Sequence, residues 1–87
     1  MLKKLFNKKY TIEMFKDMIK KKPPDLKEMQ KALDNGVDID FVDKNGETFL
    51  HYTIKKNLTT CAVFLIENGI DVNALDSNGD SPIYLAI

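Results

Sequence analysis

The sequence repeats itself at an interval of 33 residues, and this repeat restricts the possible folds more than any other feature. When residues 33–54 are aligned with residues 66–87 without a gap, seven of the 22 pairs are identical and nine more are similar. A period of about 20–50 residues is typical of stacked supersecondary units, none of which can bury its apolar face alone. The repeat therefore predicts a solenoid rather than one closed core.

Each copy carries one glycine that ends a helix and a second glycine that closes a turn. Gly36 and Gly69 follow apolar helical runs, where glycine in the left-handed conformation commonly terminates a helix. Gly46 and Gly79 close Asp-x-Asn-Gly segments, whose residue types are typical of tight turns. The two turns therefore fall at equivalent places in neighbouring units.

Helix-starting residues follow each turn. Thr48 and Ser81 stand where a helix N-cap is expected, and Pro82 occupies the first helical position, where a missing N–H is harmless. The apolar residues that come next have helical spacing: Leu50, Thr53 and Ile54 share one face, and Cys61, Phe64 and Leu65 share another, widened by Ala62 and Ile66. Each unit is thus predicted to contain a helix, a short turn, a second helix and an extended loop.

The N-terminal part of the chain fits a weaker first copy. Its apolar residues are Ile12, Phe15, Met18 and Ile19, then, after the helix-ending Pro23-Pro24 pair, Leu26, Met29, Ala32 and Leu33, which we expect to face inward. Asp25 is the expected cap of the second helix. The 33-residue register fails in the first helix, because Asp17 falls where Leu50 lies in the next copy. A longer turn between the helices, or a specialised capping repeat, would explain the shift.

A 33-residue helix–turn–helix unit with these turns resembles the ankyrin repeat. The family's Thr-Pro-Leu-His element appears as Thr48-Phe49-Leu50-His51 and again as Ser81-Pro82-Ile83-Tyr84, and its Gly-Ala-Asp-Val-Asn-Ala element appears as residues 69–74. The resemblance covers roughly residues 11–87. It implies an all-α ankyrin-repeat solenoid of about two and a half repeats, with β-turn or hairpin loops between the helix pairs.

The resemblance also implies a division of the chain. We expect an N-terminal basic segment or cap at residues 1–10, a divergent first repeat at 11–42, a second repeat at 43–75 and a partial third repeat at 76–87. Repeat proteins generally need about three units with polar caps. We therefore expect either a fragment of a longer array, which we favour, or an open apolar end that meets another copy of the chain.

Charge is unevenly distributed although the formal net charge is zero. Residues 1–31 carry ten lysines against four acids, and residues 32–87 carry three lysines against nine acids. The split indicates either a basic arm for an acidic partner or a solvated lysine-rich first repeat, and we favour the second. All 13 basic residues are lysine, which argues against specific nucleic-acid recognition. The amphipathic stretch at residues 2–9 is read as a cap, so we do not expect membrane contact.

Residues that could take part in catalysis or metal binding have structural interpretations. The resemblance places His51 at the family's structural histidine, in a hydrogen-bond network between helix starts and neighbouring repeats. Cys61 reads as a small buried hydrophobe, and a lone cysteine indicates a reducing, cytoplasmic location. The acids at 38–43 lack the glycine and closing glutamate of a calcium loop. No nucleophile has a base beside it, so we expect no enzyme activity, no metal and no cofactor.

The resemblance implies a protein–protein interaction module that binds a protein partner of unknown identity through its turn tips and first helices. The candidate contact residues are Lys44, Asn45 and Glu47 on one turn, Leu75, Ser77, Asn78 and Asp80 on the next, and Tyr52, Lys55 and Lys56 on the adjoining helix. Phe49 is added because an aromatic residue in place of the helix-starting proline is expected to be exposed. The structural residues are Gly36, Gly46, Thr48, His51, Gly69, Gly79, Ser81 and Pro82. The alternative is a self-associating structural unit, or the N-terminal part of a larger ankyrin protein with a separate effector or catalytic domain.

Overall fold

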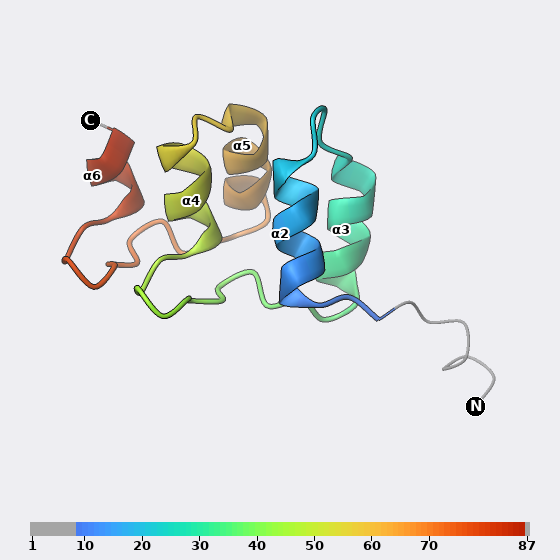
Figure 1. Cartoon of the computed structure of the whole chain (residues 1–87), viewed down its shortest axis with the longest axis horizontal. Helices are drawn as coiled ribbons and strands as arrows, with labels where there is room; N and C mark the ends of the chain where they lie inside the picture. Colours follow the sequence, from blue (N-terminus) through green and yellow to red (C-terminus); the bar gives the residue numbers. More distant parts are fainter. Residues whose placement is uncertain (1–8, 87) are drawn as a thin grey trace.

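The computed structural model describes residues 9–86, and within this range the chain forms five helices and no strand (Figure 1). The helices are α2 (Ile12–Lys20), α3 (Leu26–Asp34), α4 (Phe49–Lys55), α5 (Thr59–Glu67) and α6 (Pro82–Ala86). Helix α2 packs on α3, α4 packs on α5, and α6 lies against α4. The prediction of an all-α solenoid is confirmed. The predicted basic segment lies almost wholly outside the described residues.

Short polar side chains begin most of these helices. The side-chain oxygens of Thr11, Asp25 and Thr48 cap α2, α3 and α4 by accepting a hydrogen bond from the backbone N–H three residues later. Ser81 does the same for α6, accepting from the Tyr84 N–H at 3.2 Å. Such caps satisfy N–H groups that have no partner inside the helix. The caps predicted at Asp25, Thr48 and Ser81 are confirmed.

Three helices end in the same way, with one residue in the left-handed conformation. Gly36 (φ 104°), Asn57 (φ 59°) and Gly69 (φ 86°) follow α3, α4 and α5. At the end of α3, the Val37 N–H donates to the Ala32 carbonyl at 3.1 Å, and equivalent bonds follow α4 and α5. This pattern satisfies the last helical carbonyls and turns the chain away from the helix axis.

The shifted register of the first helix has a simple cause. Residues 21–25 join α2 to α3, whereas residues 56–58 are enough to join α4 to α5. The longer connection, one of the two predicted explanations, moves α2 by two positions. Phe15 consequently occupies a buried position, as Leu50 does in α4, and Asp17 stays exposed.

One continuous core joins the two helix pairs. Phe15 of α2 and Phe49 of α4 pack at a tilt with ring centroids 4.9 Å apart, and Leu50 and Leu65 are fully buried in the same core. Two residues expected to face inward are exposed instead, Leu26 and Ile66. Other residues form the buried faces of these helices: Met29 and Ala32 in α3, and Cys61, Ala62, Phe64 and Leu65 in α5. Leu26 and Ile66 therefore lie on the outer side of α3 and α5.

The two extended loops carry projecting turns that stack on each other. We call residues 43–47 the first finger and residues 76–80 the second finger. Each is closed by a backbone hydrogen bond, from Asp43 to Glu47 at 3.0 Å and from Asp76 to Asp80 at 2.9 Å. The fingers are joined by the Ser77 N–H, which donates to the Asn45 carbonyl at 3.0 Å.

This stacking makes Gly46 a more demanding position than Gly79. Both have positive φ, 75° and 80°, but a Cβ on Gly46 would lie 2.8 Å from the Ser77 backbone nitrogen, whereas a Cβ on Gly79 would meet nothing within 4 Å.

We expect Gly79→Ala to lower the free energy of unfolding by about 1 kcal/mol from backbone strain alone. Gly46→Ala should cost about 3 kcal/mol, because the clash adds to that strain. Urea unfolding followed by circular dichroism measures both, and equal losses would contradict the stacking.

Candidate functional site

An aspartate carboxylate organises each finger from within. Oδ1 of Asp43 accepts from the N–H groups of Asn45 at 2.8 Å and Glu47 at 2.9 Å. Oδ1 of Asp76 accepts from the N–H groups of Asn78 and Asp80, both at 2.9 Å. The hydrogen bonds from Asp80 and Asn78 hold the pKa of Asp76 below its ordinary value of 3.8, against a smaller opposing effect of desolvation. The shape of each finger is therefore fixed by hydrogen bonds between its aspartate carboxylate and its own backbone N–H groups.

His51 ties the start of α4 to the second finger. Its Nδ1 accepts from the Thr48 N–H at 3.1 Å, and its Nε2 lies 2.9 Å from the carbonyl oxygen of Asp80, to which it donates. The ring is fully buried, and both nitrogens have partners. The structural role predicted for His51 thus agrees with its hydrogen bonds.

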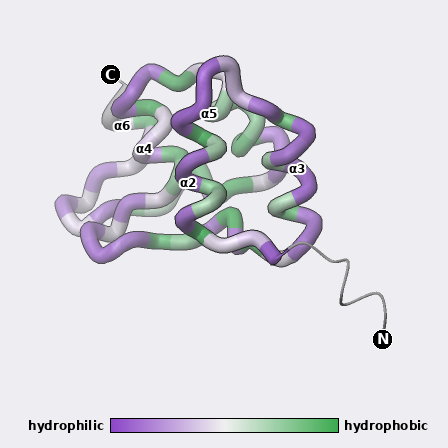
Figure 2. Tube along the Cα trace, turned by 45° about the vertical axis from the view of Figure 1, so that its right-hand side comes forward, coloured by the Kyte–Doolittle hydropathy of each residue, from purple (hydrophilic) through white to green (hydrophobic). Residues whose placement is uncertain are grey.

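The predicted contact residues lie mostly at the surface. Lys44, Asn45, Ser77 and Asn78 are exposed at the finger tips, and Lys55, Lys56 and the 63% exposed Leu75 are also accessible. Figure 2 shows the two loops side by side, with hydrophilic residues at their tips. Glu47, Tyr52 and Asp80 are partly buried. Their participation in binding stays a prediction.

The expected exposure of Phe49 is wrong. Only 4% of Phe49 is exposed, and its ring packs between those of Phe15 and Phe41, with centroid distances of 4.9 and 5.9 Å. As the first residue of α4, it is directed back toward the preceding helix pair rather than outward. Phe49 therefore belongs to the core between repeats, although it also lines a surface hollow.

That hollow, of about 230 Å³, lies between α2 and the start of α4. Phe41, Phe49 and Tyr52 supply its aromatic lining, and Lys16 and Lys20 of α2 border it. Lys16 Nζ lies 5.8 Å from the centre of the Phe41 ring, close enough for a cation–π contact. The candidate residues named from the sequence did not include Lys16, Lys20 or Phe41. The four-residue spacing of the two lysines, which places them on one face of α2, was the available signal.

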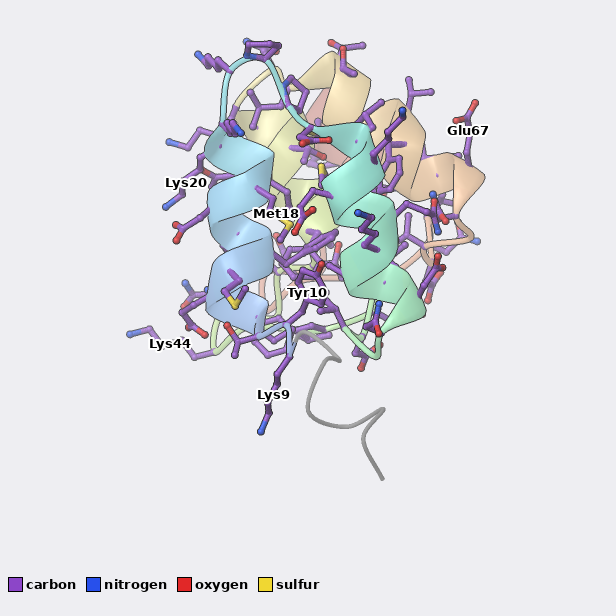
Figure 3. The ribbon with its side chains drawn as sticks, turned by 90° about the vertical axis from the view of Figure 1, so that its right-hand side faces the viewer. Lys9, Tyr10, Met18, Lys20, Lys44 and Glu67 are labelled. Carbon is purple, nitrogen blue, oxygen red and sulfur yellow. The ribbon has the colours of Figure 1, made fainter. Side chains whose placement is uncertain are left out.

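Figure 3 relates this face to the rest of the molecule. Lys20 and Lys44 project on the same side, beyond α2, whereas Glu67 lies on the opposite side of the stack. Lys55 contributes little free charge, because its ammonium group is paired with the Glu47 carboxylate, and that hydrogen bond raises the pKa of Lys55. The first helices and the fingers thus share one continuous face.

The Cys61 thiol, which could in principle react, is explained by its place in the core. Cys61 is a free thiol that is 2% exposed, lies 3.7 Å from the Ile19 carbonyl oxygen, and has its pKa raised by burial. Between residues 9 and 86, no group of three or more His, Cys, Asp and Glu side chains is placed to hold a metal ion. Within the same range, every helix is too short or too polar to traverse a bilayer.

The sequence matches the family model described as ankyrin repeats (3 copies) over residues 12–87, and the chain belongs to the ankyrin repeat family. Ankyrin repeats generally serve as protein-interaction modules, and the fold is typically non-catalytic. A comparison with curated proteins gave no significant match.

Two solved structures illustrate the likeness in fold. The ankyrin repeat domain of Bcl-3, described as a unique member of the IkappaB protein family, has a TM-score of 0.69 and 20% identity over 87% of this chain. An ankyrin repeat protein from Leishmania major has a TM-score of 0.58 and 30% identity over 67% of this chain. The present chain spans 31% and 21% of the lengths of those two chains.

The lowered pKa of Asp76 predicts a dependence of stability on pH. The folded state binds the proton of Asp76 less readily than the unfolded state, so the ionised carboxylate stabilises the protein above its ordinary pKa. That contribution is lost as the pH falls through the lower, folded-state pKa. Asp76→Asn keeps an oxygen acceptor but removes the charge. We expect wild type to be more stable near neutral pH, and the two to converge as the pH falls below the ordinary aspartate pKa of 3.8. Urea unfolding across this range is the measurement, and parallel curves would contradict it.

Proposed function

We propose that this chain is a non-catalytic protein-interaction module that binds a protein partner through its finger tips and the exposed side of its first helices. The observation that supports this most strongly is the rigid positioning of the fingers. Backbone hydrogen bonds at the Asp43 and Asp76 carboxylates, and the Ser77–Asn45 bond between fingers, hold the tips in place. The side chains of Lys44 and Ser77 are nevertheless exposed and take no part in those bonds.

Such an arrangement favours association for a thermodynamic reason. A flexible loop loses conformational entropy when a partner orders it, and that loss weakens binding. Here the backbone is already ordered before the partner arrives, so only side chains are immobilised. Tyr52, partly exposed on α4 beside the fingers, has the size and chemistry of residues that often dominate interface energies.

The remaining chemistry is consistent with a binding role. His51 is committed to two hydrogen bonds, and Cys61 is buried with a raised pKa, so neither is placed to act as a base or nucleophile. The cytoplasm remains the expected location, because a free buried thiol is compatible with a reducing compartment.

The double variant Lys44→Ala/Tyr52→Ala tests the proposal. Both residues lie on the proposed face, so we expect partner capture to fall about tenfold or more while helicity is unchanged. Capture from a lysate of the source cells, quantified by mass spectrometry, is the measurement. Lys27→Ala/Lys31→Ala, on the exposed part of α3, is the matched control and should capture normally. Equal losses in the two variants, or none in either, would contradict the proposed face.

Self-association is a second candidate, and exposed apolar residues favour it. Ile83 and Tyr84 on α6 are 59% and 64% exposed, and Val63 and Ile66 on the outer side of α5 are each 47% exposed. Apolar surface of this kind is commonly covered by another protein surface.

We expect Ile83→Asp to disperse any dimer formed through α6, because burying the added charge would be costly. Multi-angle light scattering at micromolar concentration measures the mass. Leu75→Asp, an equally exposed apolar position outside α6, should leave the mass unchanged. A wild-type monomer at every accessible concentration would remove this candidate.

A further inference from the structure

Lysines from both helix pairs gather along the groove between α2 and α4. Lys16 and Lys20, one helical turn apart on α2, border the hollow at the finger end together with Tyr52. Lys20 and Tyr52 also line a second hollow of about 280 Å³, together with Lys22, Lys56 and Leu58. Because the two hollows share residues, they form one groove, which we call the lysine groove.

Little negative charge within the described residues offsets these lysines. Glu47, a carboxylate that lines the first hollow, is already paired with Lys55. Lys20, Lys22 and Lys56 are exposed, and none forms an ion pair with a carboxylate between residues 9 and 86. The groove therefore presents an excess of positive charge.

The acids that do approach the groove are confined to its finger end. Asp43 and Glu47 line the first hollow but not the second. The Asp43 carboxylate accepts backbone hydrogen bonds, and Glu47 is paired with Lys55, so both are engaged. The two acids of α2, Glu13 and Asp17, are exposed and line neither hollow. The groove is thus polarised, with its free positive charge at the end away from the fingers.

The finger end offers a different kind of contact. The partly exposed rings of Phe41 and Tyr52 form an apolar surface there, and Lys16 covers one edge of it through its contact with Phe41. An apolar side chain of a partner would remove this aromatic surface from water, which favours association.

We propose that the lysine groove binds an acidic, extended segment of a protein partner. An apolar side chain of the segment sits against Phe41 and Tyr52, and two or more carboxylates face Lys20, Lys22 and Lys56. This inference rests on the proposed function and specifies the chemistry of the partner. Helix α4 is about 10 Å long, and an extended peptide advances about 3.3 Å per residue, so anchor and carboxylates lie about three residues apart.

A peptide fits these observations better than a nucleic acid does. The chain has no arginine, the residue best suited to bidentate phosphate and base contacts. A phosphate backbone would carry charge along its whole length, including past Asp43 and Glu47, whereas a peptide can place an apolar residue there. The groove's two ends therefore match a segment whose charge is confined to one part.

Affinity selection of the full chain against a displayed library of random peptides, each of about twelve residues, tests the chemistry directly. We expect enriched peptides to share one aromatic or branched apolar residue and at least two acids at the spacing given above. Fluorescence anisotropy with one enriched, labelled peptide then measures affinity. Affinity should fall about tenfold or more between low salt and about 0.5 M salt, because the contacts are ionic and solvent-exposed.

Charge-reversal variants assign the binding to the groove. Lys20→Glu/Lys56→Glu should weaken binding of the enriched peptide by about tenfold or more. Lys27→Glu/Lys31→Glu changes the net charge equally on α3 and should stay within about twofold of wild type. All four lysines are exposed, so circular dichroism should show unchanged folding.

Four results would overturn the inference. Enrichment of neutral peptides whose binding is lost in Tyr52→Ala but kept in Lys20→Glu/Lys56→Glu would leave the proposed function standing and remove the acidic partner. Equal weakening by the two charge-reversal variants would mean non-specific attraction. Tighter binding of a labelled oligouridine than of any enriched peptide, lost in Lys20→Glu/Lys56→Glu, would assign the groove to nucleic acid. If no peptide is enriched and the Lys44→Ala/Tyr52→Ala variant captures partners normally, the proposed function fails as well.

Discussion

Two hydrogen bonds between repeats fix the height and orientation of the second finger: the Ser77 N–H donates to the Asn45 carbonyl, and His51 Nε2 donates to the Asp80 carbonyl. A third, from the Asp71 N–H to the Asp40 carboxylate, joins the loops nearer the second helices. The Ser77–Asn45 bond joins two backbone groups and depends only on the spacing of the chain, whereas the other two bonds require the His51 and Asp40 side chains. The stacked helices supply apolar burial, and these bonds set the register in which that burial occurs.

The face that results is a property of the stack and not of either repeat. Phe49 shows this most clearly, because its ring packs against Phe15 and Phe41 of the preceding unit. The lysine groove has the same character, since Lys20 and Lys22 come from the first helix pair and Lys56 from the second. An isolated helix pair would present neither the aromatic surface nor the cluster of charge.

The sequence predicted what local chemistry determines. Glycines at 36, 46, 69 and 79 all have positive φ, and Thr48 and Ser81 cap helices, because these roles depend on a few neighbouring residues. His51 was placed correctly through its family resemblance. What escaped prediction required knowing which residues of different repeats meet. Phe49 was expected at the surface because it replaces the helix-starting proline, and the sequence did not show that Phe15 and Phe41 of the preceding unit pack against its ring. Lys16 and Lys20 were seen only as part of a solvated, lysine-rich segment.

The Asp-x-Asn-Gly turn separates the residue that is displayed from the residues that build the turn. In the first finger, Asp43 and Gly46 provide the hydrogen bonds and the positive φ, and Asn45 offers its carbonyl to the next finger. Lys44 supplies only a side chain that points into solvent, and Ser77 holds the same place in the second finger. Evolution can therefore exchange the residue at this place for one of different size or charge at little cost in stability. A new binding preference can arise there while the scaffold remains unchanged.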